Sequence, residues 1–265
     1  VDLQCAEGLT ALILACAHGH AACARRLLAH GAAVDRKSFR DGRTAMMRAC
    51  GSGAAECAAI LLGDGAFTGQ SDKQGRTALM HACDHGHADC AAMLIARGAA
   101  VDCEGHDGHT ALSLASAGGH AVCAQLLLEA GAYAGQRDKR EWTPLMHASL
   151  HGHTACARLL LAYGAPPDLQ CGDGVTALIH AVGGGHKACA ELLLAHGAVL
   201  ETARHDGWTA LMVACIRNRE ECARLLCVRG AAIPGSVLYK YGWPWLREAR
   251  RMGPTALHRL SMQDD

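Results

Sequence analysis

Histidine and cysteine residues recur together along this sequence of 265 residues, which contains 17 His and 15 Cys. Three segments place an imidazole, a glycine, a second imidazole and a thiol in close succession, namely His18–Cys23, His85–Cys90 and His151–Cys156. Imidazole and thiolate are common zinc ligands, so a His/Cys metal-binding array is one interpretation. However, a structural zinc site needs about four converging ligands, and the related segment at residues 184–186 lacks the first histidine. We therefore expect no metal here.

Cysteine beside histidine is also the pair used in nucleophilic catalysis, which requires one nucleophile in one special site. In this chain the pair instead recurs as a regular lattice. The sequence contains no Gly-x-Ser-x-Gly elbow, no Gly-x-x-x-x-Gly-Lys-Ser/Thr phosphate loop and no His-Glu-x-x-His pair. We therefore expect a protein that is not an enzyme and that uses no cofactor.

The cysteines also suggest a disulfide framework, but their number is odd. The repeated cysteines occupy one helical position in successive units, where equivalent atoms lie about 8–10 Å apart by helix packing. A disulfide requires Cα atoms within about 7 Å of each other. We therefore expect free thiols that act as small core residues in a reducing compartment, the cytoplasm or the nucleus.

The elements that position these residues follow a repeat, marked by a Thr that precedes Ala or Pro and then Leu or Met. The spacing between successive copies is 34 residues once and 33 residues five times. Ala stands five residues after every such Thr, and Cys stands thirteen residues after it. The seven marker residues are Thr10, Thr44, Thr77, Thr110, Thr143, Thr176 and Thr209.

Each repeat predicts a hairpin of two short helices. The Thr side chain can cap the first helix, and Pro144 stands where its missing N–H costs nothing. A Gly nine residues after the Thr ends this helix in six repeats, and an apolar pattern then continues to a Gly-Ala pair that ends the second helix. Asp-Gly pairs between the hairpins predict projecting β-turn fingers. Because such a hairpin cannot bury its apolar face alone, the hairpins must stack into an all-α solenoid.

At this point the repeat resembles the ankyrin repeat. The residues that carry the resemblance are Thr143-Pro144-Leu145-Met146, the Gly-His turn and the Leu-Leu-x-x-Gly-Ala ending. The pattern departs from the family where Ala replaces the usual Pro and where the usual His of the box is replaced. The resemblance implies an ankyrin-repeat solenoid with seven repeats over residues 1–232.

The two ends of the repeat pattern are atypical. Residues 242–249 echo residues 207–214 at a spacing of 35, so residues 233–265 are expected to form a degenerate eighth repeat and C-terminal cap whose helix begins at Pro244. Arg26 stands where the other repeats carry an apolar residue, which is typical of a terminal repeat. Residues 1–5, however, resemble a finger between two repeats, so an array that begins upstream is the other interpretation.

The composition agrees with a helical protein that has no affinity for nucleic acid or membranes. The formal net charge is zero and the pI is near 7.3, so no global field attracts nucleic acid. The apolar stretches are far shorter than the roughly 20 residues that span a bilayer. We expect no membrane insertion and a monomer.

The resemblance implies binding on a concave face built from finger tips and the exposed end of each first helix. A non-catalytic protein–protein interaction module, an adaptor or scaffold, is therefore the predicted function, and a spacer or regulatory domain of a larger enzyme or channel is the alternative. Trp142 and Trp208 are either interface residues or packing residues, since Trp and Arg are common hot spots. Glu141 replaces a finger glycine, which predicts a reshaped finger. The predicted partner-binding residues are Arg40, Arg43, Lys73, Arg76, His85, Lys139, Arg140, Trp142, Leu150, His151, Trp208, Ile216 and Arg217.

Overall fold

The computed structural model describes residues 1–235 and 243–252. Every regular element in these ranges is a helix, which confirms the predicted all-α fold. The chain forms two compact units, Val1–Lys139 and Arg140–Asp265. Each unit is a stack of helical hairpins.

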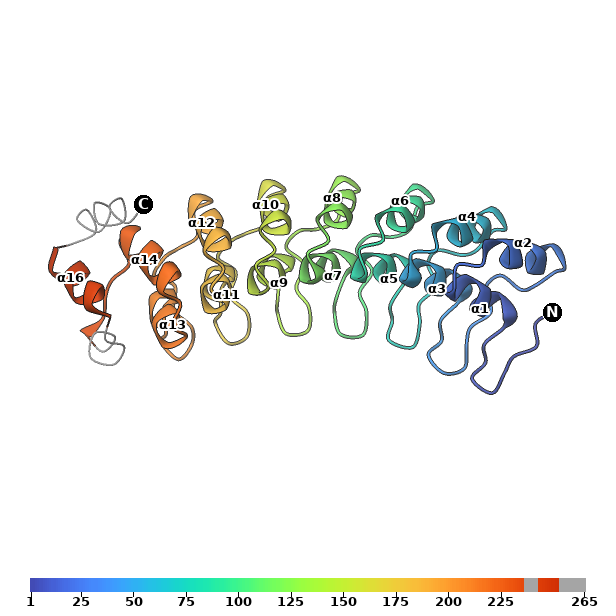
Figure 1. Cartoon of the computed structure of the whole chain (residues 1–265), viewed down its shortest axis with the longest axis horizontal. Helices are drawn as coiled ribbons and strands as arrows, with labels where there is room; N and C mark the ends of the chain where they lie inside the picture. The colour runs from blue at the N-terminus through green and yellow to red at the C-terminus, as the bar shows by residue number, and fades with distance from the viewer. Residues whose placement is uncertain (236–242, 253–265) are drawn as a thin grey trace. The chain divides into compact units, whose positions relative to one another are not determined.

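The first unit contains four hairpins. Its first helices pack in sequence on one another, and so do its second helices, which gives two layers with the fingers projecting beyond the layer of first helices (Figure 1). The helices are α1 (Ala11–Ala17), α2 (Ala21–Ala29), α3 (Ala45–Ser52), α4 (Ala55–Gly63), α5 (Ala78–Asp84), α6 (Ala88–Ala96), α7 (Ala111–Gly118) and α8 (Ala121–Glu129).

Within its described residues, the second unit repeats the same arrangement with three hairpins and one further helix. The first helices again form one layer and the second helices the other. The helices are α9 (Pro144–Leu150), α10 (Thr154–Ala162), α11 (Ala177–Gly184), α12 (Lys187–Ala195), α13 (Ala210–Ile216), α14 (Glu220–Val228) and α16 (Pro244–Met252). Pro144 and Pro244 begin their helices as predicted.

The Thr of each repeat lies at the N-cap of the first helix. In six repeats its hydroxyl accepts a hydrogen bond from the backbone N–H three residues later, as in the 3.3 Å bond from Met80 to Thr77. Thr209 is the exception, because its side chain makes no capping bond and its hydroxyl is buried without a partner among the described residues. The threonines therefore define where the first helices begin, with one cap unmade.

Six of the seven repeated cysteines lie in the core, and the thiols that lie near one another belong to different columns. Cys16 lies near Cys57 of the next repeat, and Cys50 lies near Cys90. Burial raises the pKa of Cys16 to about 12, with the neighbouring Cys57 adding to the shift. From the sequence, only the distance between equivalent cysteines of adjacent repeats was considered, so these neighbouring thiols at different repeat positions were not predicted. The thiols are free.

The first hairpin carries a partly apolar, exposed face. Cys23 is exposed, whereas the same column is buried in the other repeats. With Leu14 and Leu27 it lines a shallow hollow of about 510 Å³. Arg26 lies on the same face and is exposed, as expected of a terminal repeat. The face thus combines a polar substitution with uncovered stacking positions.

The fingers are linked to one another through their backbones. The N–H of Lys73 donates to the carbonyl of Asp41 at 2.9 Å, and that of His106 donates to Gln74 at 2.7 Å. Glu141 has φ 61°, the left-handed conformation that Gly108 adopts at the same place with φ 80°. The backbone at Glu141 therefore follows the glycines, contrary to the expectation that it reshapes its finger.

Candidate partner-binding surface

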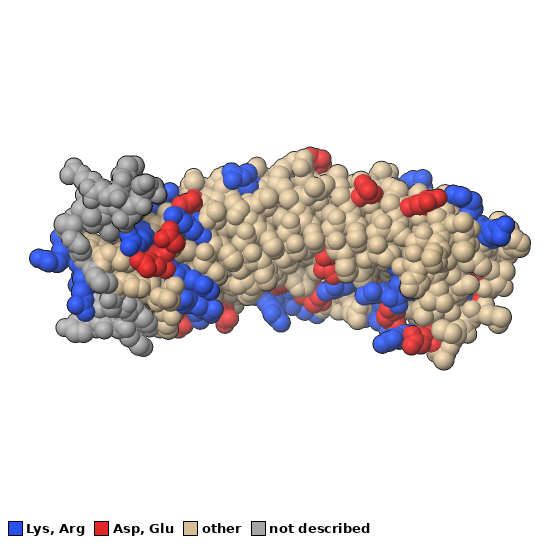
Figure 2. All heavy atoms as spheres, viewed as in Figure 1, with Lys and Arg blue, Asp and Glu red and all other residues tan. Residues whose placement is uncertain are grey.

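Acidic and basic side chains lie side by side over the fingers of the first unit (Figure 2). Asp41 is 2.7 Å from Arg48 and 3.6 Å from Arg43. Arg76 lies 3.2 Å from Asp84 and 3.0 Å from Asp107. Arg43 and Arg76 are half-buried. These two predicted binding residues are therefore already engaged in ion pairs, Arg43 within the fingers and Arg76 with both α5 and the next finger.

A buried acid and histidine lie beneath these ion pairs. Asp72 and His81 are 6% and 1% exposed, and their Oδ2 and Nε2 atoms are 2.9 Å apart. Burial works to raise the pKa of Asp72, but hydrogen bonds from the backbone N–H of Arg76 and from His81 outweigh it, and the pKa lies below its usual range. Burial, helped by the charge of Arg43, lowers the pKa of His81 despite Asp72. The pair therefore joins this finger to α5.

The other predicted residues of the first unit are exposed but are held by polar contacts. Arg40 lies 3.4 Å from Glu7, and the Lys73 ammonium donates to the carbonyl of Phe39 at 2.7 Å. His85 stacks on His87 with ring centroids 6.1 Å apart. Lys139 is exposed. This part of the predicted site therefore presents charges that mostly have partners already.

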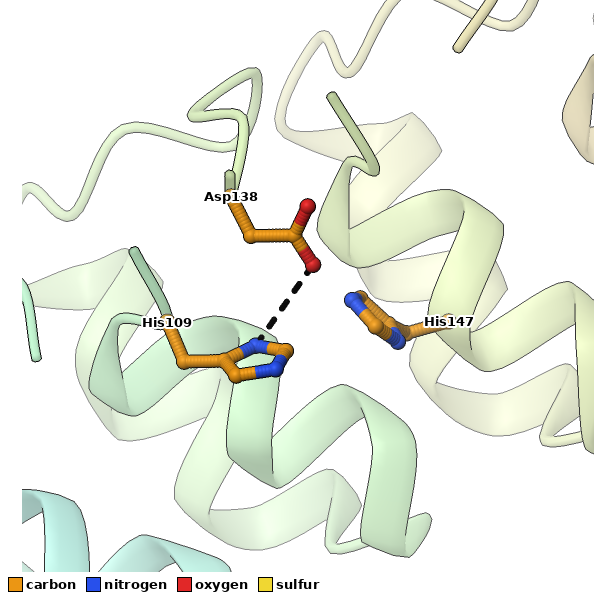
Figure 3. Close-up of side chains that lie close together, drawn as sticks. All are labelled: His109, Asp138 and His147. Carbon is orange, nitrogen blue, oxygen red and sulfur yellow. Dashed lines mark ion pairs between the residues drawn. The ribbon is translucent and has the colours of Figure 1, made fainter. Parts of the chain in front are cut away.

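A second acid and histidine, Asp138 and His109, lie close together in the first unit. His109 Nδ1 lies 3.7 Å from Asp138 Oδ2 (Figure 3). The same nitrogen lies 3.1 Å from the Ser113 hydroxyl. Ser113 also completes a capping box with Thr110. Asp72 and Asp138 were not among the predicted site residues, although both stand five residues before a marker Thr, a shared position that could have indicated them.

In the second unit, Trp142 lies among histidines. Its ring centroid is 5.2 Å from that of His147 and 4.3 Å from that of His180. The indole is half-buried, so it has both a packing surface and an accessible surface. Neither His147 nor His180 was among the predicted binding residues, although both stand four residues after a marker Thr, as His81 does.

The remaining predicted residues of the second unit are accessible to different degrees. Ile216 is 48% exposed, and Trp208 and Leu150 are half-buried. The carbonyl of Leu150 is 3.0 Å from His186 Nε2. The exposed polar members of the predicted set are Arg140, His151 and Arg217. This surface therefore offers aromatic and aliphatic groups beside cationic ones.

His180 has an unusual polar environment. Its Nε2 atom is buried and has no hydrogen-bond partner within the described ranges, and the same holds for Nε of Arg204. Burial is the main cause that lowers the pKa of His180 to about 4, and the nearby His147, Arg204 and His151 contribute to the same shift. The imidazole is thus held neutral in a cationic environment.

Helix α16 of the second unit presents a basic face. Leu246 and Ala249 of α16 are buried, whereas Arg247, Arg250 and Arg251 are exposed. The guanidinium of Arg224 lies 5.0 Å from the Trp245 ring, a cation–π contact.

Among the residues that the structure describes, none of the helices has the length and apolar character required to span a membrane.

Comparisons with known proteins give a consistent result. A family model described as ankyrin repeats in three copies matches residues 1–72, 36–104, 61–138, 97–171, 130–204 and 163–235. The crystal structure of the human ASB11 ankyrin repeat domain is similar, with a TM-score of 0.77 and 27% sequence identity over 86% of this chain and 100% of that chain. The comparison with curated proteins found no match.

Proposed function

Because the chain belongs to the ankyrin-repeat family, we propose that it is a non-catalytic adaptor or scaffold that binds a protein partner on its finger-bearing concave face. Ankyrin repeats are generally protein–protein interaction modules. The observation that carries the proposal is the surface of the second unit, where Trp142, Leu150 and Trp208 are partly accessible and Ile216 is 48% exposed. Aromatic residues and arginine supply most binding energy at protein interfaces.

The binding residues of this proposal fall into two groups. In the second unit, accessible apolar groups supply the affinity, and the cations beside them assist association. In the first unit, Arg40, Lys73 and His85 contribute rim charges, which affect association rate more than affinity. Arg43 and Arg76 position the fingers, since both are half-buried in ion pairs. Lys139 belongs to the same rim.

The proposal is tested by affinity capture from a cell lysate with the wild-type chain and with Trp208→Ala. Proteins that bind this surface are expected to lose roughly tenfold or more in affinity, which corresponds to about 1.4 kcal/mol. Tyr163→Ala is the matched control, because Tyr163 is an exposed aromatic residue at the end of α10. Equal retention of the captured proteins by wild type and Trp208→Ala, with both folded by circular dichroism, would contradict the site assignment.

We also propose that the protein is a monomer in a reducing compartment, the cytoplasm or nucleus, and that it does not bind nucleic acid. The free buried thiols support the compartment, because disulfides are rare where glutathione and thioredoxin keep thiols reduced. The zero net charge supports the absence of nucleic-acid binding. Light scattering tests the monomeric state, and a gel-shift assay with duplex DNA and RNA tests the absence of nucleic-acid binding.

A further inference from the structure

We propose that His180 and Arg204, beside Trp142, form a carboxylate-binding site that accepts an Asp or Glu side chain of a protein partner. The inference deepens the proposed function and rests on it for its setting. It starts from two buried nitrogen atoms, His180 Nε2 and Arg204 Nε, that have no hydrogen-bond partner in the described part of the chain. Buried polar atoms in native proteins are nearly always satisfied, so such atoms call for an explanation.

The third repeat shows how this position is normally satisfied. His81 stands four residues after Thr77, and Asp72 stands five residues before it. The Asp72 carboxylate lies 2.9 Å from His81 Nε2 and 3.5 Å from the Arg43 guanidinium. A carboxylate between an imidazole and a guanidinium is therefore the arrangement that this scaffold builds internally.

The sixth repeat has the same histidine but lacks the acid. His180 stands four residues after Thr176, and the position five residues before that Thr is Cys171. The backbones correspond, since the Cys171 N–H donates to Val175 at 3.1 Å just as the Asp72 N–H donates to Arg76 at 3.0 Å. A thiol is a weak acceptor and carries no charge in its protonated form. The buried Cys171 therefore leaves His180 without the internal carboxylate that His81 has.

The charges around His180 favour an anion. His147 and His151 belong to α9 and its C-cap, and Arg204 comes from the following finger; all three neighbours disfavour the charged form of the His180 imidazole. Arg204 also forms an ion pair with Asp206, whose Oδ2 is 3.1 Å from Arg204 Nη2 and whose side chain is 48% exposed. Asp206 therefore engages the outer end of the guanidinium and leaves Nε available.

Trp142 controls access to this site. Its ring lies 4.3 Å from the imidazole, and His180 Nε2 is buried in the free protein. Entry of a carboxylate therefore requires a neighbouring side chain to move, and we assign that movement to the half-buried indole. The bound carboxylate would accept hydrogen bonds from Nε2 and from Arg204, which are charge-assisted and stronger than neutral ones.

Binding is linked to protonation with a definite sign. A carboxylate beside His180 stabilises the imidazolium, so it raises the pKa of His180 from the low value of the free protein. The complex then binds a proton that the free protein does not, and affinity increases as the pH falls from neutrality towards the pKa of the carboxylate itself. His147, His151, Arg204 and Asp206 face the same region, so mutants are needed to assign the proton to His180.

The test is an NMR titration of the intact chain with acetate, followed on the imidazole resonances. The expected result is a saturable shift of His180 and a higher His180 pKa, with no effect from acetamide, which has the same shape without the charge. His81 is the internal control, because Asp72 already occupies its site. A His180 resonance that does not respond to acetate, or that responds equally to acetamide, would overturn the proposal.

Two variants keep the result interpretable. Cys171→Asp places an acid where the third repeat has Asp72, so the pKa of His180 should rise without acetate and the acetate response should weaken roughly tenfold or more. His180→Phe keeps a ring in place and should abolish proton uptake on binding. An unchanged acetate response in folded Cys171→Asp would also overturn the proposal. The titration needs no protein partner, so its failure leaves the protein-binding proposal intact, and failure of the lysate capture leaves this result intact.

Discussion

The Asp72–His81 pair makes the stability of its finger depend on one buried carboxylate. Asp72→Asn removes the charge but keeps the size, and it weakens bonds from His81 and from two backbone N–H groups. We expect the free energy of unfolding at pH 7 to fall by about 1–3 kcal/mol, the usual cost of an impaired buried hydrogen-bond network. Urea unfolding followed by circular dichroism measures the change.

The pH dependence of this effect has a fixed sign. The pKa of Asp72 is depressed from 3.8, so its contribution is present above that value and is lost as pH falls through the folded pKa. The pKa of His81 is depressed from 6.5, so the unfolded chain binds its proton first and stability falls below that pH. Asp64→Asn is the control, because Asp64 is exposed. Equal losses in the two variants would contradict the assigned role of Asp72.

At the scale of the helix, the capping threonines predict unequal costs for the same substitution. Thr77→Ala removes the hydrogen bond to the N–H of Met80 and should lower stability by about 1 kcal/mol. Thr209 makes no capping bond, so Thr209→Ala should change stability by less than about 0.5 kcal/mol. Thermal and urea unfolding of both variants provide the comparison. A larger loss for Thr209→Ala would show that its hydroxyl is satisfied in solution.

The helices and hairpins were predictable because each depends on local signals that recur at a fixed spacing. A Thr cap, a Gly break and an apolar stripe act within one repeat. The contacts of the candidate site were not predictable in the same way, since the ring of Trp142 meets that of His180 in the following repeat. The Asp72–His81 pair spans a finger and a helix. Such pairs require the register between elements, which a single repeat does not contain.

The same limit explains the thiols. From the sequence, equivalent cysteines in adjacent repeats are too far apart to bond, and that argument is sound for equivalent positions. The stacking offset instead brings the end of one first helix against the second helix of the next repeat, so Cys50 meets Cys90. Glu141 is a similar case, because its left-handed backbone is imposed by the finger rather than chosen by the residue.

At the scale of the whole molecule, the burial of the thiols predicts a labelling pattern. Cys5 and Cys23 are exposed and Cys103 is intermediate, whereas the other twelve cysteines are buried. N-ethylmaleimide should therefore modify Cys5 and Cys23 first in the native protein and all 15 cysteines in urea. Peptide mass spectrometry over time measures the order. Cys57 is the matched control for Cys23, since it holds the same position one repeat later, and equal rates would contradict the stacking of the first unit.

The face that exposes Cys23 and Leu14 has a practical consequence. This face exposes positions that are buried in the other hairpins, because the cysteine equivalent to Cys23 is covered in every following repeat. A hairpin copied from residues 45–63 and fused ahead of this face would cover Leu14 and Cys23 once the charged Arg26 on the same face is replaced by an apolar residue. Protein engineers could thus lengthen the array one repeat at a time from this end, and so set the distance between two attached domains in steps, with a single substitution at the junction.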